Sequence, residues 1–265
     1  MSLTDLLPAF RQSGLVRLQG LLPADRVQAA RAAVLRPLQR LGLWRDDAWR
    51  LDALPRPHWP DTGLKTSRVI GNRDPALAAL VEDAALLAAV GALLEGRPYE
   101  PPGPARRPQV LFTLPNAETW MVPAVGWHAD SPRLASGQSA GVQMFAFLDP
   151  VGPGGGGPVA VAGSHRLLNH GRSIRPADFA SLLRAEQFFA DLLKGADGSA
   201  NRGMVGDVPL SVVEMTGRPG DVWLMDLRVL HASAPNAARW PRVMLTFRYE
   251  RSDLLAEVAD AWGWA

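Results

Sequence analysis

The sequence predicts a mainly β protein, an antiparallel sandwich or jelly roll, with helices attached to it. From residue 109 onward, short runs rich in β-branched, aromatic and other apolar residues alternate with turns of Gly, Pro, Asn or Asp. The first hundred residues instead show helical patterns. One more helical segment, at residues 175 to 195, interrupts the series of strands.

The composition is that of a folded globular chain. Of its 265 residues 47% are hydrophobic and 20% are charged, without a long polar run or an internal repeat. Sandwiches and barrels of this length commonly form one unit. We therefore expect a single domain over residues 1–265, with a helix-rich part (1–100), a jelly-roll core (105–250) and an insertion (170–210).

Two helices are expected before the strands begin. Residues 22–42, LPADRVQAARAAVLRPLQRLG, have an acidic residue in the first turn and end at a glycine. Residues 76–95 form the most apolar stretch, but Glu82 and Asp83 interrupt it, which favours a packed amphipathic helix over a membrane span. The segment between the two helices, 52–63, has the composition of a loop.

The expected strands are QVLFTL from residue 109, GVQMFAFLD from 141, GPVAVAG from 157, LSVVEM from 210, GDVWLMD from 220 and RVMLTFRYE from 242. The glycine tract VGPGGGGP, 151–158, lacks the Gly-Lys-Ser/Thr ending of a phosphate loop, so we interpret it as a flexible strand connection. The helical segment 175–195 and the polar residues after it are long for a connection in a compact sandwich. We expect a lid over the barrel mouth there; a surface insertion is the alternative.

Charge and cysteine content exclude several classes of function. The net charge is +2, and 26 of the 28 basic residues are Arg dispersed among acidic ones, so no basic stripe indicates a nucleic-acid partner. The N-terminal residues lack the pattern of a secretory signal, and we expect a cytoplasmic protein with no membrane partner. Because the chain has no Cys, it has no disulfide and no thiolate, and a metal must be held by nitrogen and oxygen ligands.

The segment GWHADSP places His128 and Asp130 two positions apart, where an extended strand points both side chains to the same face. His231, at the end of the apolar strand in GDVWLMDLRVLH, is the natural third ligand. Two imidazoles and one carboxylate form the facial triad of non-haem iron(II) oxygenases, and zinc is the alternative ion. Arg242 lies eleven residues after His231, where a hairpin can return its guanidinium toward the metal to bind the distal carboxylate of a co-substrate. The Ser233 hydroxyl could donate to the same carboxylate.

These motifs resemble the phytanoyl-CoA dioxygenase family of iron(II)- and 2-oxoglutarate-dependent oxygenases. The resemblance rests on WHAD, on GSHR at 163–166, on RPGDVWLMDLRVLHASAPN and on the spacing of Arg242, and it extends from SRVIGNRDP to FRYER. It implies a double-stranded β-helix (a cupin-like jelly roll) that binds Fe(II), 2-oxoglutarate and O₂. By position, it implies that His128, Asp130 and His231 bind iron.

The resemblance further implies that Arg242 and Ser233 hold the C5 carboxylate of 2-oxoglutarate, and that Gln109 faces the co-substrate or substrate. Related halogenases lack the carboxylate ligand, so Asp130 favours hydroxylation of a small molecule, such as a natural product or an amino-acid-like metabolite. A zinc-dependent hydrolase and a barrel that only binds remain alternatives. Substrate walls are expected in 115–125, 133–145 and 170–210.

The other candidates have simpler interpretations. His165 in GSHR is expected to shape a loop, and His58 and His170 are expected at the surface. Arg239 and Arg248 are alternatives to Arg242 as the anchor, and both could be surface charges. The side chains of Trp120, Met121 and Trp127 border the expected site, where core packing is favoured over a role in a substrate pocket.

Overall fold

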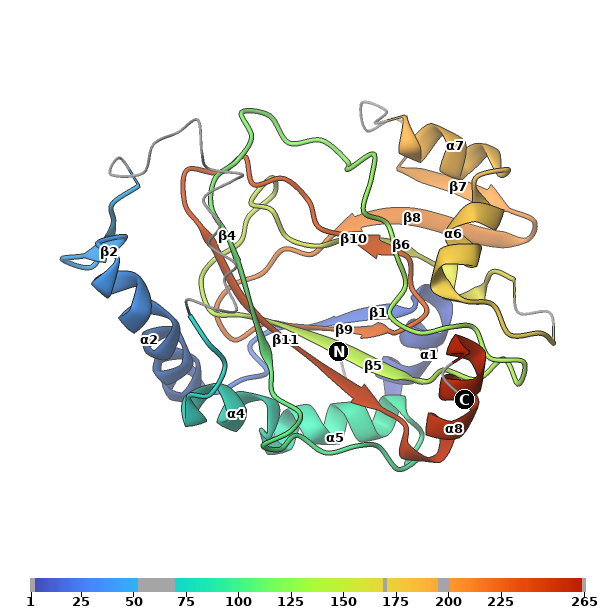
Figure 1. The fold of residues 1–265 in the computed structure, drawn as a ribbon, viewed down its shortest axis with the longest axis horizontal. Coiled ribbons are helices and arrows are strands. Elements are labelled where there is room, and N and C mark those ends of the chain that lie inside the picture. The colour runs from blue at the N-terminus through green and yellow to red at the C-terminus, as the bar shows by residue number, and fades with distance from the viewer. Residues whose placement is uncertain (1–2, 52–69, 169–170, 195–200, 264–265) are drawn as a thin grey trace.

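Two antiparallel sheets packed face to face form the centre of the protein (Figure 1). The computed structural model describes residues 3–51, 70–168, 171–194 and 201–263. The larger sheet has the strand order β1-β9-β5-β11-β4 and the smaller one β10-β6-β8-β7. This architecture confirms the predicted jelly-roll core with helices around it.

The helices are α1 (Leu3–Ser13), α2 (Ala24–Arg40), α4 (Pro75–Val81), α5 (Ala84–Leu93), α6 (Pro176–Leu183), α7 (Gln187–Leu193) and α8 (Leu255–Trp262), with short 3₁₀ turns η2 (Ser164–Arg166) and η3 (Ser252–Leu254). The strands are β1 (Leu15–Leu18), β2 (Trp44–Arg45), β3 (Ala48–Trp49), β4 (Gln109–Thr113), β5 (Gly141–Phe147), β6 (Val159–Ala162), β7 (Arg202–Val205), β8 (Val208–Glu214), β9 (Val222–Asp226), β10 (His231–Ala232) and β11 (Arg242–Glu250).

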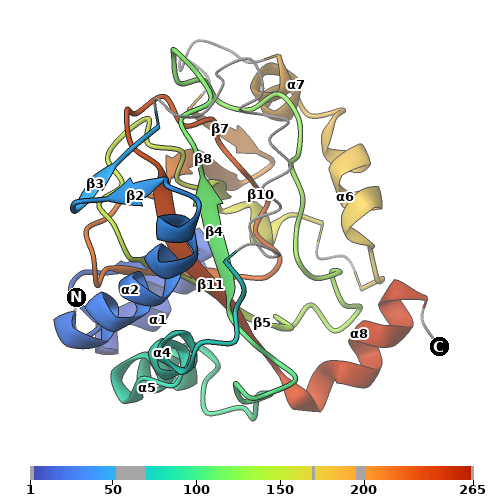
Figure 2. The ribbon, with the colours of Figure 1, turned by 60° about the vertical axis from the view of Figure 1, so that its left-hand side comes forward.

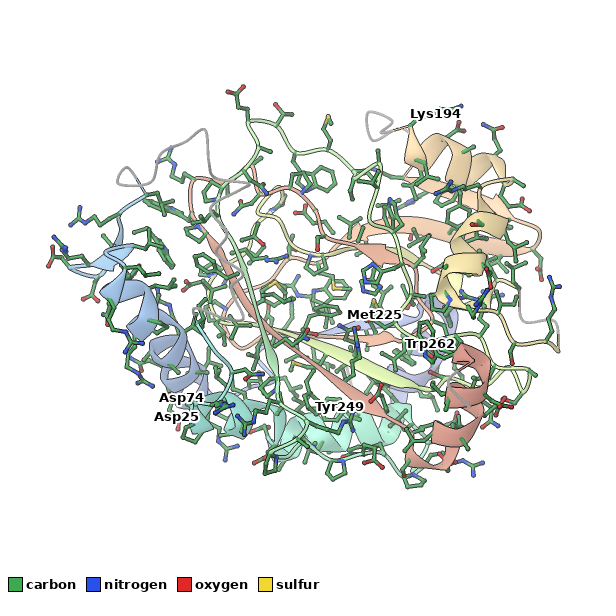
Figure 3. All side chains as sticks on the ribbon, viewed as in Figure 1. Asp25, Asp74, Lys194, Met225, Tyr249 and Trp262 are labelled. Atoms are coloured by element: carbon green, nitrogen blue, oxygen red, sulfur yellow. The ribbon has the colours of Figure 1, made fainter. Side chains whose placement is uncertain are left out.

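The larger sheet is covered on both faces, which explains why all seven residues of β5 are buried. Val142 and Met144 belong to the core between this sheet and the helices. Phe145 and Phe147, on the opposite face, belong to the interior between the two sheets. Met225 lies in the same interior, and Figure 3 labels it there. A strand with two buried faces reads as a continuous apolar run.

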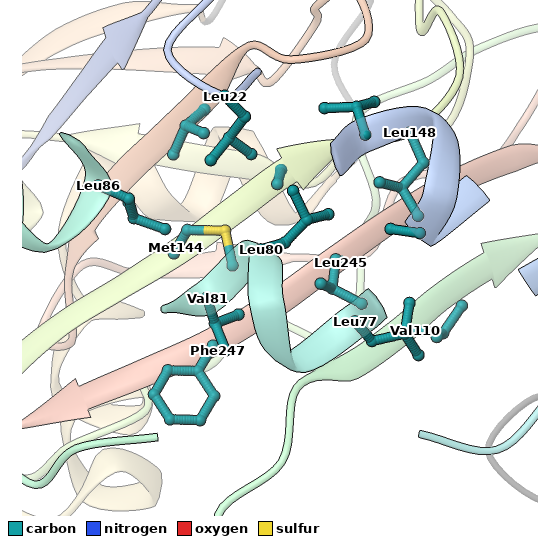
Figure 4. Packing of buried hydrophobic residues seen from close by; sticks show 14 of the residues in the cluster. Leu22, Leu77, Leu80, Val81, Leu86, Val110, Met144, Leu148, Leu245 and Phe247 are labelled. Atoms are coloured by element: carbon teal, nitrogen blue, oxygen red, sulfur yellow. The ribbon is translucent and has the colours of Figure 1, made fainter. Parts of the chain in front are cut away.

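Helices α2, α4 and α5 cover the outer face of the larger sheet (Figure 1). Figure 4 shows Leu77, Leu80 and Val81 of α4 pointing toward Leu245 and Phe247 of β11, and all five side chains are buried. Their spacing follows the helical repeat, so one face of the helix contacts the sheet. This layer supports the strands that carry the site.

The single helix predicted over 76–95 is two helices in the structure. Asp83, buried between α4 and α5, accepts hydrogen bonds at Oδ1 from the backbone N–H of Ala85, 3.0 Å away, and of Leu86, 3.4 Å away. Side chains of this type satisfy the free N–H groups of a first helical turn, so Asp83 begins a new helix. Among the described residues no single helix is long and apolar enough to span a membrane; the α4–α5 pair passes that test jointly, with a 42° bend.

The N-terminal part also contributes to the larger sheet, which the sequence did not predict. Strand β1 pairs with β9, with Leu15 opposite Met225 and Leu18 opposite Val222. The four-residue run LVRL has no clear alternation, and its strand character comes from pairing with a distant partner. The segment 52–63, predicted as a loop, lies outside the described residues.

The predicted helix over 175–195 is also divided, into α6 and α7. Both helices lie beside the smaller sheet (Figures 1 and 2), and Phe188 of α7 packs so closely on β7 that a Cβ at Gly203 would lie 2.5 Å from its ring. Phe179, Leu183 and Phe189 join one apolar cluster with partly buried Trp127. The insertion therefore packs against the segment that carries the first histidine.

Candidate metal centre

The structure brings His128, Asp130 and His231 together. One nitrogen from each imidazole and one carboxylate oxygen lie within 4.8 Å of one another. His231 is on β10 of the smaller sheet, and the other two residues lie in the long connection between β4 and β5. These three residues come from segments about one hundred positions apart in the chain.

Backbone pairing positions the two histidines. His128 and His231 form an isolated antiparallel bridge in which each N–H donates to the carbonyl of the other residue at 2.9 Å. The N–H of Asp130 donates to the carbonyl of Leu227 at 2.9 Å. The sequence predicted an extended strand at this point, whereas a single bridged residue inside a loop produces the same side-chain convergence.

The hydrogen bonds of both imidazoles favour the metal-binding tautomer. His128 Nδ1 lies 2.9 Å from the carbonyl oxygen of Gly126, and His231 Nδ1 lies 3.1 Å from that of Val229. A carbonyl only accepts, so each Nδ1 carries a proton, and Nε2 is the ring nitrogen that can offer a lone pair to a metal. The Nε2 atoms face Asp130, at 3.8 Å for His128 and 3.5 Å for His231.

Burial affects the protonation of His231 and the hydrogen bonding of Asp130. Burial lowers the pKa of His231 to about 4, although Asp130 opposes that shift, so the imidazole is neutral at physiological pH. Asp130 Oδ2 is buried and has no hydrogen-bond partner among the described residues. Two imidazoles beside a carboxylate with an unsatisfied oxygen fit a divalent cation with nitrogen and oxygen ligands.

Arg242, at the start of β11, is a buried cation. Its Nη1 donates to the carbonyl of Gly156 at 2.6 Å and its Nη2 to Thr113 Oγ1 at 2.7 Å, while Nε has no partner among the described residues. Burial lowers its pKa to about 10. No ion pair joins it to a described acidic residue, so the site has capacity for an anionic ligand.

Glycines make the Arg242 site possible. A Cβ at Gly157 would lie 2.0 Å from the carbonyl oxygen of Met215, and one at Gly156, whose φ is 76°, would lie 2.8 Å from Asn236. The tract therefore connects β5 and β6, as predicted, and also requires glycine for close backbone approach. No local pattern indicated that Gly156 and Thr113 would hold Arg242.

No hydrogen bond joins Arg242 to either of the two other residues expected at the co-substrate. Ser233 is exposed, and no hydrogen bond joins it to a described residue. Gln109 is exposed at the opposite end of β4 from Thr113, paired with Thr246 of β11. Their roles stay predictions.

Of the alternative arginines, Arg248 contacts the site. Its Nη2 lies 2.6 Å from Asp130 Oδ1, whereas Arg239 is exposed and has no ion pair within the described chain. The alternation of β11 could have indicated this, because residues 242, 244, 246 and 248 share one face of the strand. His165 is buried on η2, with Nε2 3.1 Å from the carbonyl of Arg11, apart from the triad. His58 and His170 lie outside the described residues.

The tryptophans near the triad are packed. Trp127 Nε1 donates to the carbonyl of Pro123 at 2.7 Å, and its ring lines a cavity of about 130 Å³ together with Leu183 and Phe189. Trp120 packs on the same apolar cluster, while Met121 is exposed. Helices α6 and α7 thus form one wall of the cavity beside Trp127, the residue before His128.

The fold is shared with solved oxygenase structures. The carbocyclase SnoK of nogalamycin biosynthesis, described as non-haem and α-ketoglutarate dependent, has a TM-score of 0.57 and 19% identity over 95% of this chain and 85% of its own. EctD from S. alaskensis, solved with 2-oxoglutarate and 5-hydroxyectoine, has a TM-score of 0.57 and 19% identity over 96% of this chain and 77% of its own. The epimerase SnoN was solved with Fe³⁺, α-ketoglutarate and a nogalamycin compound. It has a TM-score of 0.54 and 15% identity over 94% of this chain and 84% of its own.

Sequence comparison identifies the family. No curated protein matches the chain significantly. The sequence profile described as phytanoyl-CoA dioxygenase (PhyH) matches residues 10–244, which include all three residues of the triad and Arg242. The chain belongs to the phytanoyl-CoA dioxygenase family of iron(II)- and 2-oxoglutarate-dependent oxygenases.

Proposed function

We propose that His128, Asp130 and His231 bind Fe(II) and that Arg242 binds the C5 carboxylate of 2-oxoglutarate, with Ser233 as a further donor. The convergence of two imidazole Nε2 atoms and a carboxylate supports the metal assignment. The two Nδ1 hydrogen bonds support it further, because they fix the ring orientation that a metal needs.

The observation that carries the proposal is the buried Arg242 without an acidic partner in the described chain. A buried guanidinium is costly unless a negative group pairs with it. A dicarboxylate supplies a negative group for Arg242 at one end and chelates the metal with its other end. Thr113 and Gly156 each take one Nη atom and so leave Nε and the remaining Nη hydrogens for the ligand.

The protein's own contribution is positioning and the exclusion of water. Phe145, Phe147 and Met244 fill the interior between the sheets, and the ring of Phe145 lies 6.3 Å from that of His231. Fe(II) with 2-oxoglutarate and O₂ supplies the oxidising power for C–H hydroxylation, with succinate and CO₂ as co-products. The carboxylate of Asp130 favours this outcome over halogenation.

The substrate we propose is a small molecule, a class supported by the nogalamycin compound in the SnoN structure and by 5-hydroxyectoine in the EctD structure. Gln109 is proposed to face it from the end of β4. We further propose that residues 1–265 form a single oxygenase domain in the cytoplasm. The pairing of β1 with β9 supports the single domain, because it ties the N-terminal part into the central sheet.

An anaerobic titration tests the proposal directly. The Fe(II)-loaded protein is titrated with 2-oxoglutarate while the visible metal-to-ligand charge-transfer band of bidentate chelation is recorded. We expect the band in the wild type, its loss or a large rise in the required 2-oxoglutarate in Arg242→Ala, and no change in Arg239→Ala, a matched variant of an exposed arginine. Absence of the band with iron bound would contradict the proposal and favour a zinc hydrolase or a barrel that only binds.

A further inference from the structure

An arginine contacts the candidate metal ligand from the larger sheet. Arg248 Nη2 lies 2.6 Å from Asp130 Oδ1, and the Arg248 side chain is 44% exposed. It stands on the same face of β11 as Thr246 and Arg242, directed toward the space between the sheets. The long side chain of Arg248 is partly exposed beside the triad, so its guanidinium can contact a ligand that enters there.

A small cavity adjoins this arginine. It has a volume of about 200 Å³, and its lining includes Arg106, Arg107, Gln109, Gln143, Thr246 and Arg248. Sites for drug-sized ligands are typically larger, about 300–1,000 Å³, so this space suits a compact molecule or the head group of a larger one.

The lining carries more positive than negative charge. Three arginines and one acidic residue, Glu250, border the cavity, and Arg106 pairs with Glu250 at 2.5 Å. Arg107 donates from Nε to the carbonyl of Pro104, and its Nη atoms make no hydrogen bond to another described residue. The acidic partner of Arg248 in the described chain is Asp130, a proposed metal ligand. A carboxylate that binds a metal shares its charge with that metal, so Arg248 remains available to a second anion.

The buried floor of the cavity has an unsatisfied acceptor. Thr246 Oγ1 donates to the carbonyl of Met144 at 2.7 Å and therefore accepts from Gln143 Nε2 at 3.0 Å, which fixes the orientation of the amide. Gln143 Oε1 then has no hydrogen-bond partner among the described residues, although the side chain is only 4% exposed. Buried acceptors are normally satisfied, and a ligand hydroxyl or amine would satisfy this one.

We infer that this cavity binds the primary substrate through an anionic oxygen group, a carboxylate or a phosphate, with Arg248 as the specificity-determining residue. Gln143 Oε1 accepts a hydrogen bond from a hydroxyl or amine of the same molecule. The inference rests on the proposed function, because it is the triad beside Arg248 that would make a molecule bound here a substrate. It narrows the substrate class from small molecules in general to anionic ones with a nearby donor.

Matched ligand pairs test the inference in the Fe(II)- and 2-oxoglutarate-loaded protein under anaerobic conditions. The probes are 3-hydroxybutyrate, its primary amide and butyrate for the carboxylate arm, and glycerol 3-phosphate and glycerol for the phosphate arm. Binding is measured by calorimetry and by perturbation of the charge-transfer band. We expect 3-hydroxybutyrate to bind at least about tenfold more tightly than its amide, or glycerol 3-phosphate at least about tenfold more tightly than glycerol. A gain of this size is expected from a charge-assisted contact.

Three variants assign the effect. Arg248→Gln should remove the preference for the anion yet keep the charge-transfer band, and Arg45→Gln, which changes an exposed arginine on β2, should leave both unchanged. Gln143→Leu should reduce the advantage of 3-hydroxybutyrate over butyrate. Equal binding of anions and neutral partners by the wild type, or no binding of any probe, would overturn the inference.

Two further outcomes separate this inference from the proposed function. Loss of the band in Arg248→Gln would overturn the inference by making Arg248 a residue for 2-oxoglutarate or for the metal. Absence of the band in the wild type would contradict the proposed function itself, and the inference would fall with it.

Discussion

His128 and His231 are bound to each other through their backbones as well as converging through their rings. Each N–H donates to the carbonyl of the other at 2.9 Å, and the ring centroids lie 4.3 Å apart. A reciprocal pair of hydrogen bonds fixes both backbones before any ligand is present, so the loop bearing His128 and Asp130 is tied to the smaller sheet. The donor set is thus organised in advance.

Replacement of His231 by Ala is expected to abolish Fe(II) binding at the triad and succinate formation, because two ligands do not complete the facial set. Metal content by calorimetric titration and turnover by succinate release check this. His165→Ala is a useful comparison, since that buried imidazole lies apart from the triad and should leave Fe(II) binding intact. Full activity of His231→Ala would remove this residue from the site.

Arg242→Met is expected to separate stability from function. Removing a buried cation that has no acidic partner in the described part of the chain should leave the free energy of unfolding unchanged or raise it by about 1–2 kcal/mol without 2-oxoglutarate. The same change should weaken 2-oxoglutarate binding by about a hundredfold, because charge-assisted contacts are lost. Chemical denaturation with and without 2-oxoglutarate measures both effects, and ligand stabilisation of the variant equal to that of the wild type would contradict the assignment.

Acid should destabilise the fold through Asp226. Burial raises the pKa of this carboxyl, but the charge and hydrogen bonds of Arg228, at 2.9 Å, more than offset that and hold the pKa at about 2. Because this is below its unfolded value of about 3.9, the stabilisation is complete above roughly pH 5 and is lost as the pH falls toward 2. It amounts to on the order of 2–3 kcal/mol.

Unfolding by urea at pH 5 and pH 3 checks this contribution. Asp226→Asn should unfold more easily at pH 5 and show a smaller loss between the two pH values. Asp207→Asn, an exposed surface control, should follow the wild type. An identical pH response of Asp226→Asn and the wild type would refute the assignment.

Gly157→Ala is expected to disturb the Arg242 site from a distance. The new Cβ would lie 2.0 Å from the carbonyl of Met215, so the backbone must move, and Gly156, whose carbonyl accepts from Arg242, is adjacent. We expect lower thermal stability and a higher KM for 2-oxoglutarate. Gly152→Ala, where a Cβ meets nothing within 4 Å, is the matched control. Equal behaviour of the two variants would show that the close approach does not matter.

Leu80→Ala should lower the free energy of unfolding by about 2–5 kcal/mol, because this side chain is fully buried between α4 and the larger sheet. Leu41→Ala, at a leucine that is 51% exposed, should cost much less. Denaturant midpoints compare the two. Similar losses would contradict the packing seen in Figure 4.

Local patterns in the sequence predicted six strands of the core, β4, β5, β6, β8, β9 and β11, and the candidates His128, Asp130 and His231. They missed β7, and they joined His231 to the strand β9, although β9 ends at Asp226 and His231 is on β10 of the other sheet. They could not predict the partners of Arg242, because Thr113 and Gly156 lie 129 and 86 positions away and meet it only through the packing of strands. The contact between Arg248 and Asp130 has the same origin, over 118 positions.

The wrong prediction of a single helix over 76–95 has a local cause. Asp83 interrupts an apolar run whose hydrophobic pattern continues on both sides, so periodicity alone joined α4 to α5. Asp83 is also a strong capping residue, and that chemistry could have indicated the break. Strand β1 is too short for periodicity to reveal.

His231 and Arg242 belong to opposite layers of the sandwich. His231 is on the smaller sheet and Arg242 on the larger one, and aromatic and methionine side chains fill the interval between the two sheets. With the roles proposed above, the thickness of that filling would set which chain length of diacid reaches both residues at once. Selectivity for a five-carbon diacid over its shorter or longer homologues would then depend on the core as well as on the residues that touch the ligand.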